Sequence, residues 1–175
     1  MKTNRDEKGK CQGFGECLES SDNTQCNQCI KSADIRTKIT CKDKHVSYTL
    51  VNDVDPKEFV KNYTIDGAVI DGDIRKCDGM FYVPNLNKVL LIELKGNQFE
   101  HAVTQLLSTF DILKDELSGK QVYSRIVSSN VPQIRVPSPD MKRLTIVTKR
   151  YSGTYKNFSS SGACEEKLSQ LDNTK

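Results

Sequence analysis

Residues 88–95, KVLLIELK, are the stretch that most constrains the fold of this chain. The core of the stretch, residues 89–92, is continuously apolar, which is typical of a strand covered on both faces. The stretch then ends in Glu93 and Lys95, and the two-residue period of a strand places both on one face. Two opposite charges are therefore expected to emerge together where a buried strand reaches the edge of the core.

A second strand is predicted just before this one. Residues 77–83, CDGMFYV, are rich in strand formers, and the four residues PNLN separate them from the stretch at 88–95. This arrangement predicts a β-hairpin. In an antiparallel pair, Asp78 would lie beside Glu93 and Lys95, which gives a candidate site of two carboxylates and an ammonium group. Carboxylate oxygens are preferred ligands of Mg²⁺, so Asp78 and Glu93 are candidate metal ligands.

The clearest helix of the chain follows Lys95. Asn97 and Glu100 form a capping-box-like start, and Ser118 and Gly119 end the pattern. Gln105 lies at the border of the apolar stripe, where it is either a polar flank or a side chain that reaches the site at the sheet edge. The stripe itself follows spacings of three and four through Phe99, Val103, Leu106, Phe110, Leu113 and Leu117.

Other segments complete the predicted sheet. Short β-branched or apolar runs predict four more strands: 35–41, 45–51, 122–127 and 144–147. The first two, joined by KDK, are expected to form a hairpin. A proline at its start favours a short helix over 55–60, and 67–70 is a predicted short strand. Residues 131–140 hold three prolines and are a predicted loop beside a substrate groove.

The pattern of Asp78, a short loop and then Glu93-Leu94-Lys95 resembles the PD-(D/E)xK nuclease superfamily, which has the restriction-endonuclease-like fold. Members often carry a glutamine on the helix after this strand, and Gln105 matches it. The proline that names the motif is absent, because Lys76 and Cys77 precede Asp78. The resemblance covers residues 63–150, including the predicted strand at 63–67.

The resemblance implies an α/β fold, with a restriction-endonuclease-like core in which helices flank a mixed central β-sheet. It implies a metal-dependent nuclease that hydrolyses phosphodiester bonds, most often in DNA, with Asp78, Glu93, Lys95 and Gln105 as catalytic residues. Asp78 and Glu93 would hold Mg²⁺ or Mn²⁺, and Lys95 would orient or deprotonate a water or neutralise the phosphate. The family also supplies an acid from an upstream helix, for which Glu58 and Asp66 are both candidates. A non-catalytic nucleic-acid- or protein-binding module of the same fold is the alternative.

Length and composition are those of one domain with a single core. The chain has 175 residues, of which 36% are hydrophobic and 28% charged. It has no run of eighteen apolar residues, and its N-terminus lacks the apolar region of a signal peptide, so a cytoplasmic location without membrane contact is expected. We divide the chain into a Cys-rich extension (1–34), a nuclease-like domain (35–156) and a polar, loosely held tail (157–175).

Four of the seven cysteines lie close together near the N-terminus: Cys11, Cys17, Cys26 and Cys29. The CxxC spacing of Cys26 and Cys29 suits two thiolates on one Zn²⁺, and the other two would complete a tetrahedral site. Free thiols in a cap segment are the favoured interpretation, and a structural zinc is the alternative. A zinc-organised adaptor is therefore a further class of function. Disulfides would require an oxidising compartment.

The modest net charge of +3 conceals an asymmetry. Residues 120–175 hold ten Lys or Arg and four acids, whereas residues 1–119 hold sixteen and nineteen. The basic segment, residues 120–175, therefore follows the candidate site in the chain. A nucleic acid is the expected partner, because phosphates bind such a surface with strong salt dependence.

Overall fold

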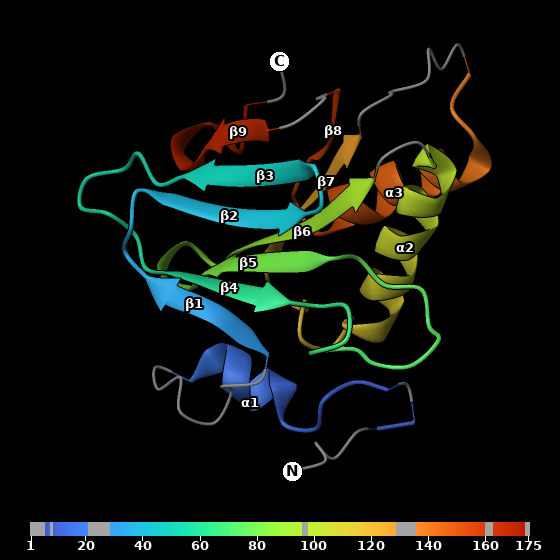
Figure 1. The fold of residues 1–175 in the computed structure, drawn as a ribbon, viewed down its shortest axis with the longest axis horizontal. Helices are drawn as coiled ribbons and strands as arrows, with labels where there is room; N and C mark the ends of the chain where they lie inside the picture. Colours follow the sequence, from blue (N-terminus) through green and yellow to red (C-terminus); the bar gives the residue numbers. More distant parts are fainter. Residues whose placement is uncertain are drawn as a thin grey trace.

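The computed structural model describes residues 6–7, 9–20, 29–95, 98–128, 136–159 and 163–173, which form two β-sheets with helices (Figure 1). The helices are α1 (Phe14–Glu19), α2 (Phe99–Ile112) and α3 (Pro139–Arg150), and short 3-10 turns lie at Pro84–Leu86 and Leu168–Gln170. The strands are β1 (Ile30–Asp34), β2 (Lys38–Asp43), β3 (Val46–Val51), β4 (Val60–Thr64), β5 (Gly79–Val83), β6 (Lys88–Lys95), β7 (Gln121–Ser128), β8 (Tyr155–Ser159) and β9 (Ala163–Lys167).

The larger sheet has six strands in the order β1-β4-β5-β6-β7-β8. Neighbours from β1 to β6 are antiparallel, whereas β6, β7 and β8 run parallel through the crossover helices α2 and α3. The prediction of an α/β fold with a mixed central sheet is therefore confirmed. The smaller sheet has the order β2-β3-β9, and its last strand pairs parallel with β3.

The two faces of β6 are covered by different layers. Val89 and Leu91 pack into a core with α1, α2 and α3, whereas Leu90, Ile92 and Leu94 pack against the smaller sheet. This alternation is the physical basis of the continuous apolar run, because each face of the strand needs apolar side chains. Within the described residues, the three α-helices thus cover one face of the central sheet, and a second sheet covers the other.

Several predicted elements are confirmed. The strand at 88–95 is β6, and it pairs antiparallel with β5, as the predicted hairpin requires. The hairpin of 35–41 and 45–51 corresponds to β2 and β3. The strand at 122–127 is β7, and the helix after Lys95 is α2, which ends at Ile112 and not at the predicted Ser118 and Gly119. The proposed cap Asn97 lies outside the described residues.

Four local predictions are wrong. Residues 144–147 belong to α3, which starts with Ser138 as a cap that accepts from the Met141 amide and with a proline in its first turn. Residues 55–59 form no helix, and β4 begins at Val60. The strand expected at 63–67 ends at Thr64, and residues 67–70 form a turn with an isolated bridge at Ile70.

Both ends of the described chain contribute to the core. β1 lies in the central sheet, and Phe14 and Leu18 of α1 are buried in the core on the helical side. The expectation of a loosely held tail is wrong for residues 163–173, since β9 is paired and Leu168 and Leu171 are buried. Half of the loop predicted at 131–140, residues 131–135, lies outside the described residues, and Pro139 and Asp140 belong to α3.

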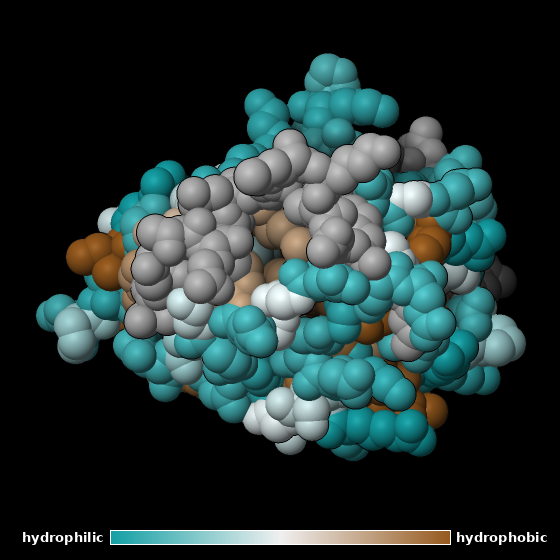
Figure 2. Space-filling model, turned by 90° about the horizontal axis from the view of Figure 1, so that it is seen from below, coloured by the Kyte–Doolittle hydropathy of each residue, from teal (hydrophilic) through white to brown (hydrophobic). Residues whose placement is uncertain are grey.

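The face that carries α1 is mostly hydrophilic, and its described hydrophobic residues form small separate patches (Figure 2). No helix among the described residues is long and apolar enough to cross a membrane.

Candidate functional site

Asp78 and Glu93 lie opposite each other where the ladder between β5 and β6 ends. The last paired residues are Gly79 and Ile92, so one further step along each strand reaches the two acids. The Leu94 amide donates to Oδ2 of Asp78 over 2.7 Å. The Asp78 carboxylate therefore continues the strand pairing with its side chain, which fixes its position beside Glu93.

Glu93 is a fully buried carboxyl group without hydrogen-bond donors among the described residues. It is 0% exposed, and neither of its carboxylate oxygens accepts a hydrogen bond from the described residues. Its nearest cation, the Lys95 ammonium, lies 3.4 Å from Oε1, in contact but outside hydrogen-bond geometry. Burial, and then the nearby Asp78, raise the pKa of Glu93 to about 9, against a weaker opposing effect of Lys95. In the absence of a cation, the Glu93 carboxyl is therefore protonated at neutral pH.

The pKa of Asp78 is raised less, to about 6. Burial is the main cause, and the hydrogen bond from the Leu94 amide opposes it. Asp43, at the end of β2, raises the pKa further. The two carboxyls thus differ in charge at pH 7, with Asp78 mostly ionised and Glu93 mostly neutral.

Gln105 holds Lys95 in place from α2. The Lys95 ammonium donates to Oε1 of Gln105 over 2.8 Å, and Nε2 of Gln105 donates to the Lys76 carbonyl over 2.8 Å. The amide therefore connects the strand that carries Lys95 with the segment that leads to Asp78. Gln105 is thus in direct contact with Lys95, and its role as a site residue stays a prediction.

Thr109, one turn further along α2, reinforces this connection. Its hydroxyl accepts from the Cys77 amide over 2.9 Å and donates to the Gln105 carbonyl over 2.9 Å. Thr109 is fully buried, so water does not compete for these bonds. Sequence reasoning missed this residue, because a threonine inside a helical stripe looks like an ordinary core position.

The two upstream acids lie at different ends of β4. Glu58 precedes the strand and accepts from the Asn85 side chain over 2.9 Å, far from Asp78 in the register. Asp66 follows the strand on the side of the site and pairs with the Lys76 ammonium over 3.2 Å. Asp66 also contributes to the raised pKa of Asp78. Of the two candidates, only Asp66 therefore belongs to the surroundings of the site.

The smaller sheet approaches the site closely at Gly79. A Cβ atom at this position would lie 2.6 Å from Sγ of Cys41 on β2, so a side chain does not fit there. This close packing also brings Asp43 near Asp78. The sequence predicted the hairpin that carries Asp43, but it holds no local signal that the hairpin lies over the site.

The site has the chemistry that a hard divalent cation requires. Two carboxylates lie side by side, and the oxygens of Glu93 lack hydrogen-bond donors among the described residues. A buried carboxylate without hydrogen-bond donors is costly, and a bound cation would lower that cost. The described residues contain no group of three His, Cys, Asp or Glu side chains arranged to hold a metal, so further ligands would come from backbone oxygens or water.

The N-terminal cysteines do not form one group within the described part of the chain. Cys17 is disulfide-bonded, whereas Cys11 and Cys29 are thiols, the latter donating to the Ala68 carbonyl, and Cys26 lies outside the described residues. A sulfur in a disulfide is not a thiolate ligand, so the zinc alternative applies only to a reduced form of the protein. Cys77 is fully buried, and burial raises the pKa of its thiol well above the ordinary range.

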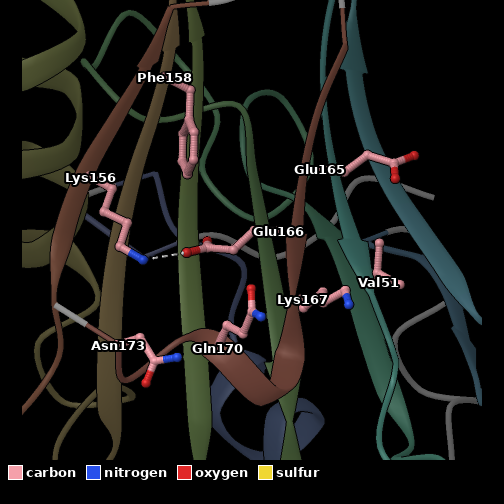
Figure 3. A pocket seen from close by; sticks show the side chains of 8 residues that line it. All are labelled: Val51, Lys156, Phe158, Glu165, Glu166, Lys167, Gln170 and Asn173. Atoms are coloured by element: carbon pink, nitrogen blue, oxygen red, sulfur yellow. Dashed lines mark hydrogen bonds and ion pairs between the residues drawn. The ribbon is translucent and has the colours of Figure 1, made fainter. Parts of the chain in front are cut away.

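A second group of polar residues lies on the other face of the central sheet, at a groove of about 570 Å³ between β8 and β9 (Figure 3). Glu166 projects from β9 into this region, and the Lys156 ammonium on β8 donates to its Oε1 over 2.9 Å. Arg125 donates from Nε to Oε2 of Glu166 over 2.6 Å, and the Tyr48 hydroxyl donates to the same oxygen over 2.6 Å. Each oxygen of Glu166 is thus paired, which makes the group a structural link between the two sheets.

Comparison with protein-family models, with curated proteins and with solved structures finds no match to this chain. Membership of the PD-(D/E)xK superfamily therefore remains a prediction that rests on the motif.

Proposed function

We propose that this protein is a metal-dependent nuclease that hydrolyses phosphodiester bonds, with DNA as the main substrate. The observation that supports it best is Glu93, a buried carboxylate that lies opposite Asp78 and lacks hydrogen-bond donors among the described residues. A side chain in this state is expensive to keep for stability alone, because both its protonated and its ionised form lose hydrogen bonds to water.

Asp78 and Glu93 would hold Mg²⁺ or Mn²⁺ between them. A bound divalent cation acidifies a water molecule and neutralises the charge that develops on the phosphoryl group. Because Glu93 is protonated without a cation, it would release its proton when the ion binds. The affinity for the ion would therefore rise with pH up to about 9, the pKa of this carboxyl.

Lys95 would act on the substrate side of the carboxylate pair. Its ammonium is already held by Gln105 and lies next to Glu93, so little ordering is needed when substrate binds. From this position, the amine can donate to a phosphate oxygen or move a proton to or from a water molecule. Gln105 would position Lys95 and would not itself exchange a proton.

A cleavage panel tests the proposal. Labelled single- and double-stranded DNA and RNA are incubated with the protein and Mg²⁺ or Mn²⁺, beside an Asp78→Asn variant. The asparagine keeps an oxygen that accepts from the Leu94 amide, so the variant preserves the strand end while removing the charge. We expect cleavage by the wild type and its loss in the variant. Folded wild-type protein that binds a nucleic acid but cleaves no member of the panel would favour the non-catalytic module.

A further inference from the structure

Helix α3 presents two rows of basic side chains to solvent. Its core-facing side consists of Met141, Leu144 and Thr148, all buried. Successive residues of an α-helix turn by about 100°, which places Lys142 and Lys149 together on one flank of the opposite side and Arg143 with Arg150 on the other. All four basic residues are exposed.

A single apolar residue, Ile146, separates the two rows. Ile146 lies between them on the same outward side, and it is 53% exposed. Of the four basic residues, only Arg143 has an acidic partner among the described residues, at 3.4 Å from Asp111. Three positive charges of α3 therefore have no countercharge in the described part of the chain.

The helix starts near the candidate site and runs away from it. The Ser138 hydroxyl, at the start of α3, donates to Glu100 in the first turn of α2 over 3.0 Å. α2 itself starts close after Lys95. At the far end, Arg150 lines a pocket of about 590 Å³ together with Lys114 and Lys120. The basic surface thus extends from the neighbourhood of the site to the opposite end of the sheet.

We propose that α3 lies in the major groove of double-stranded DNA, with its two basic rows on the two phosphate strands that border the groove. This inference rests on the proposed function and assigns a substrate-binding surface to it. The major groove is roughly 12 Å wide and admits an α-helix, whose diameter with side chains is about 10–12 Å. Ile146 would then face the floor of the groove.

The same features disfavour the other nucleic acids. The major groove of A-form RNA is deep and narrow, so a helix with two flanking rows does not enter it. Single strands are held largely by stacking on aromatic rings. The exposed residues of α3 include no aromatic side chain, because they are the four basic residues with Pro139, Thr145 and Ile146.

The test is fluorescence anisotropy with labelled duplex DNA in EDTA, so that binding is measured without cleavage. The triple variant Lys142→Gln, Lys149→Gln, Arg150→Gln is compared with the control Lys38→Gln, Lys57→Gln, Lys167→Gln, which removes three exposed charges near the end of the smaller sheet that lies away from Asp43. We expect the α3 variant to bind about ten- to a hundredfold more weakly and its salt slope to fall by roughly 2 to 3, since each lost phosphate contact changes the slope by about 0.9. The control should keep the wild-type slope.

Three outcomes would overturn the groove assignment. These are wild-type binding by the α3 variant, an equal loss in the control, and duplex RNA or single-stranded DNA that binds wild-type protein as tightly as duplex DNA. Thermal melting verifies that each variant is folded. Because the assay needs no cleavage, a protein that binds through α3 but cleaves nothing would refute only the proposed nuclease activity.

Discussion

Two buried glutamates on opposite faces of the central sheet show how differently one residue type is used in this molecule. Glu93 is 0% and Glu166 is 8% exposed, so both carboxyls are removed from water. Burial acts on both in the same direction, and it raises the pKa of Glu93 to about 9. At Glu166, hydrogen bonds from Arg125, Tyr48 and Lys156 outweigh burial, and the pKa is lowered.

The difference lies in the neighbours and not in the depth of burial. The Glu166 carboxylate pairs with the Arg125 guanidinium, which is itself 0% exposed. Its other donors are Tyr48 on β3 and Lys156 on β8. Glu93 meets another acid and a lysine that Gln105 holds away from ideal geometry. Removing a fully paired carboxylate leaves its buried partners without a countercharge, whereas a carboxylate that lacks hydrogen-bond donors is available for a ligand.

The largest expected effect is on cleavage, and it should distinguish Lys95, beside Glu93, from Lys156, beside Glu166. Lys95→Ala should lower single-turnover cleavage by about 10²–10⁴-fold, the range for loss of a general acid–base group, while the protein still binds Mg²⁺. Glu93→Ala should lose both cleavage and Mg²⁺ binding. Lys156→Ala is the matched control and should cleave like the wild type. Magnesium titration and single-turnover kinetics measure these effects, and unchanged cleavage in folded Lys95→Ala would refute the proposed role.

Removal of Glu166 should affect stability instead. Glu166→Ala leaves the Arg125 guanidinium buried without its carboxylate, which is expected to cost about 3–5 kcal/mol. The neighbouring Glu165, whose exposed pair with Lys38 is 2.6 Å long, is the control, and Glu165→Ala should change stability by no more than about 0.5 kcal/mol. Urea denaturation gives both values. Equal losses in the two variants would mean that Glu166 is not a structural link.

Glu93→Gln should change stability in the opposite direction. In metal-free protein, Glu93 has a pKa of about 9 when folded and an ordinary value near 4.5 when unfolded. The folded state therefore binds more protons in this window, and wild-type stability falls as pH rises through it. At pH 7 the variant should be more stable than wild type by about 3 kcal/mol, at 1.36 kcal/mol for each pH unit above the unfolded value.

The measurement is denaturation of both proteins in EDTA at pH 5, 6 and 7. The gain of Glu93→Gln should shrink towards zero as the pH approaches 4.5, the ordinary pKa of the carboxyl. A variant that is less stable than wild type at pH 7 would show that the Glu93 carboxylate is paired in solution.

The smallest expected effect is on stability, from the hydrogen bond between Thr109 of α2 and the Cys77 amide. Thr109→Val leaves the Cys77 amide buried without an acceptor, which should cost about 1–2 kcal/mol. Thr109→Ser should restore most of the loss, because it keeps the hydroxyl. Thr104→Val, at a half-buried position of α2 where the hydroxyl donates to the His101 carbonyl, is the control and should be almost neutral. Equal urea midpoints for Thr109→Val and wild type would contradict this role.

The sequence predicted the parts of the candidate site that depend on local pattern. Strand alternation brought Glu93 and Lys95 to one face, and the predicted hairpin brought Asp78 opposite them. Gln105 was predicted from the border of a helical stripe, and its contact with Lys95 is present. Each of these residues lies in a single continuous stretch, so the geometry of neighbouring elements was sufficient.

Other features depend on contacts that no local pattern carries. The link between Arg125 and Glu166 joins β7 to β9, and nothing in either strand's sequence indicates the partner. Residues 144–147, LTIV, suit a strand because three of them are β-branched, yet in α3 only Leu144 is buried and Ile146 is exposed. The cap at Ser138 and the proline that follows it were the better signal for α3.

The pairing of β9 with β3 has a consequence for the order in which the protein folds. Tyr48 and Glu166 are 118 positions apart in the chain, whereas Lys95 and Gln105 are 10 apart, and Asp78 and Leu94 are 16 apart. Closing a long loop costs more entropy, and contacts between near neighbours in sequence form faster. We therefore expect the hairpin of β5 and β6 and helix α2 to assemble before β9 docks. Arg125 would then pair with the Glu166 carboxylate only in the last step of folding.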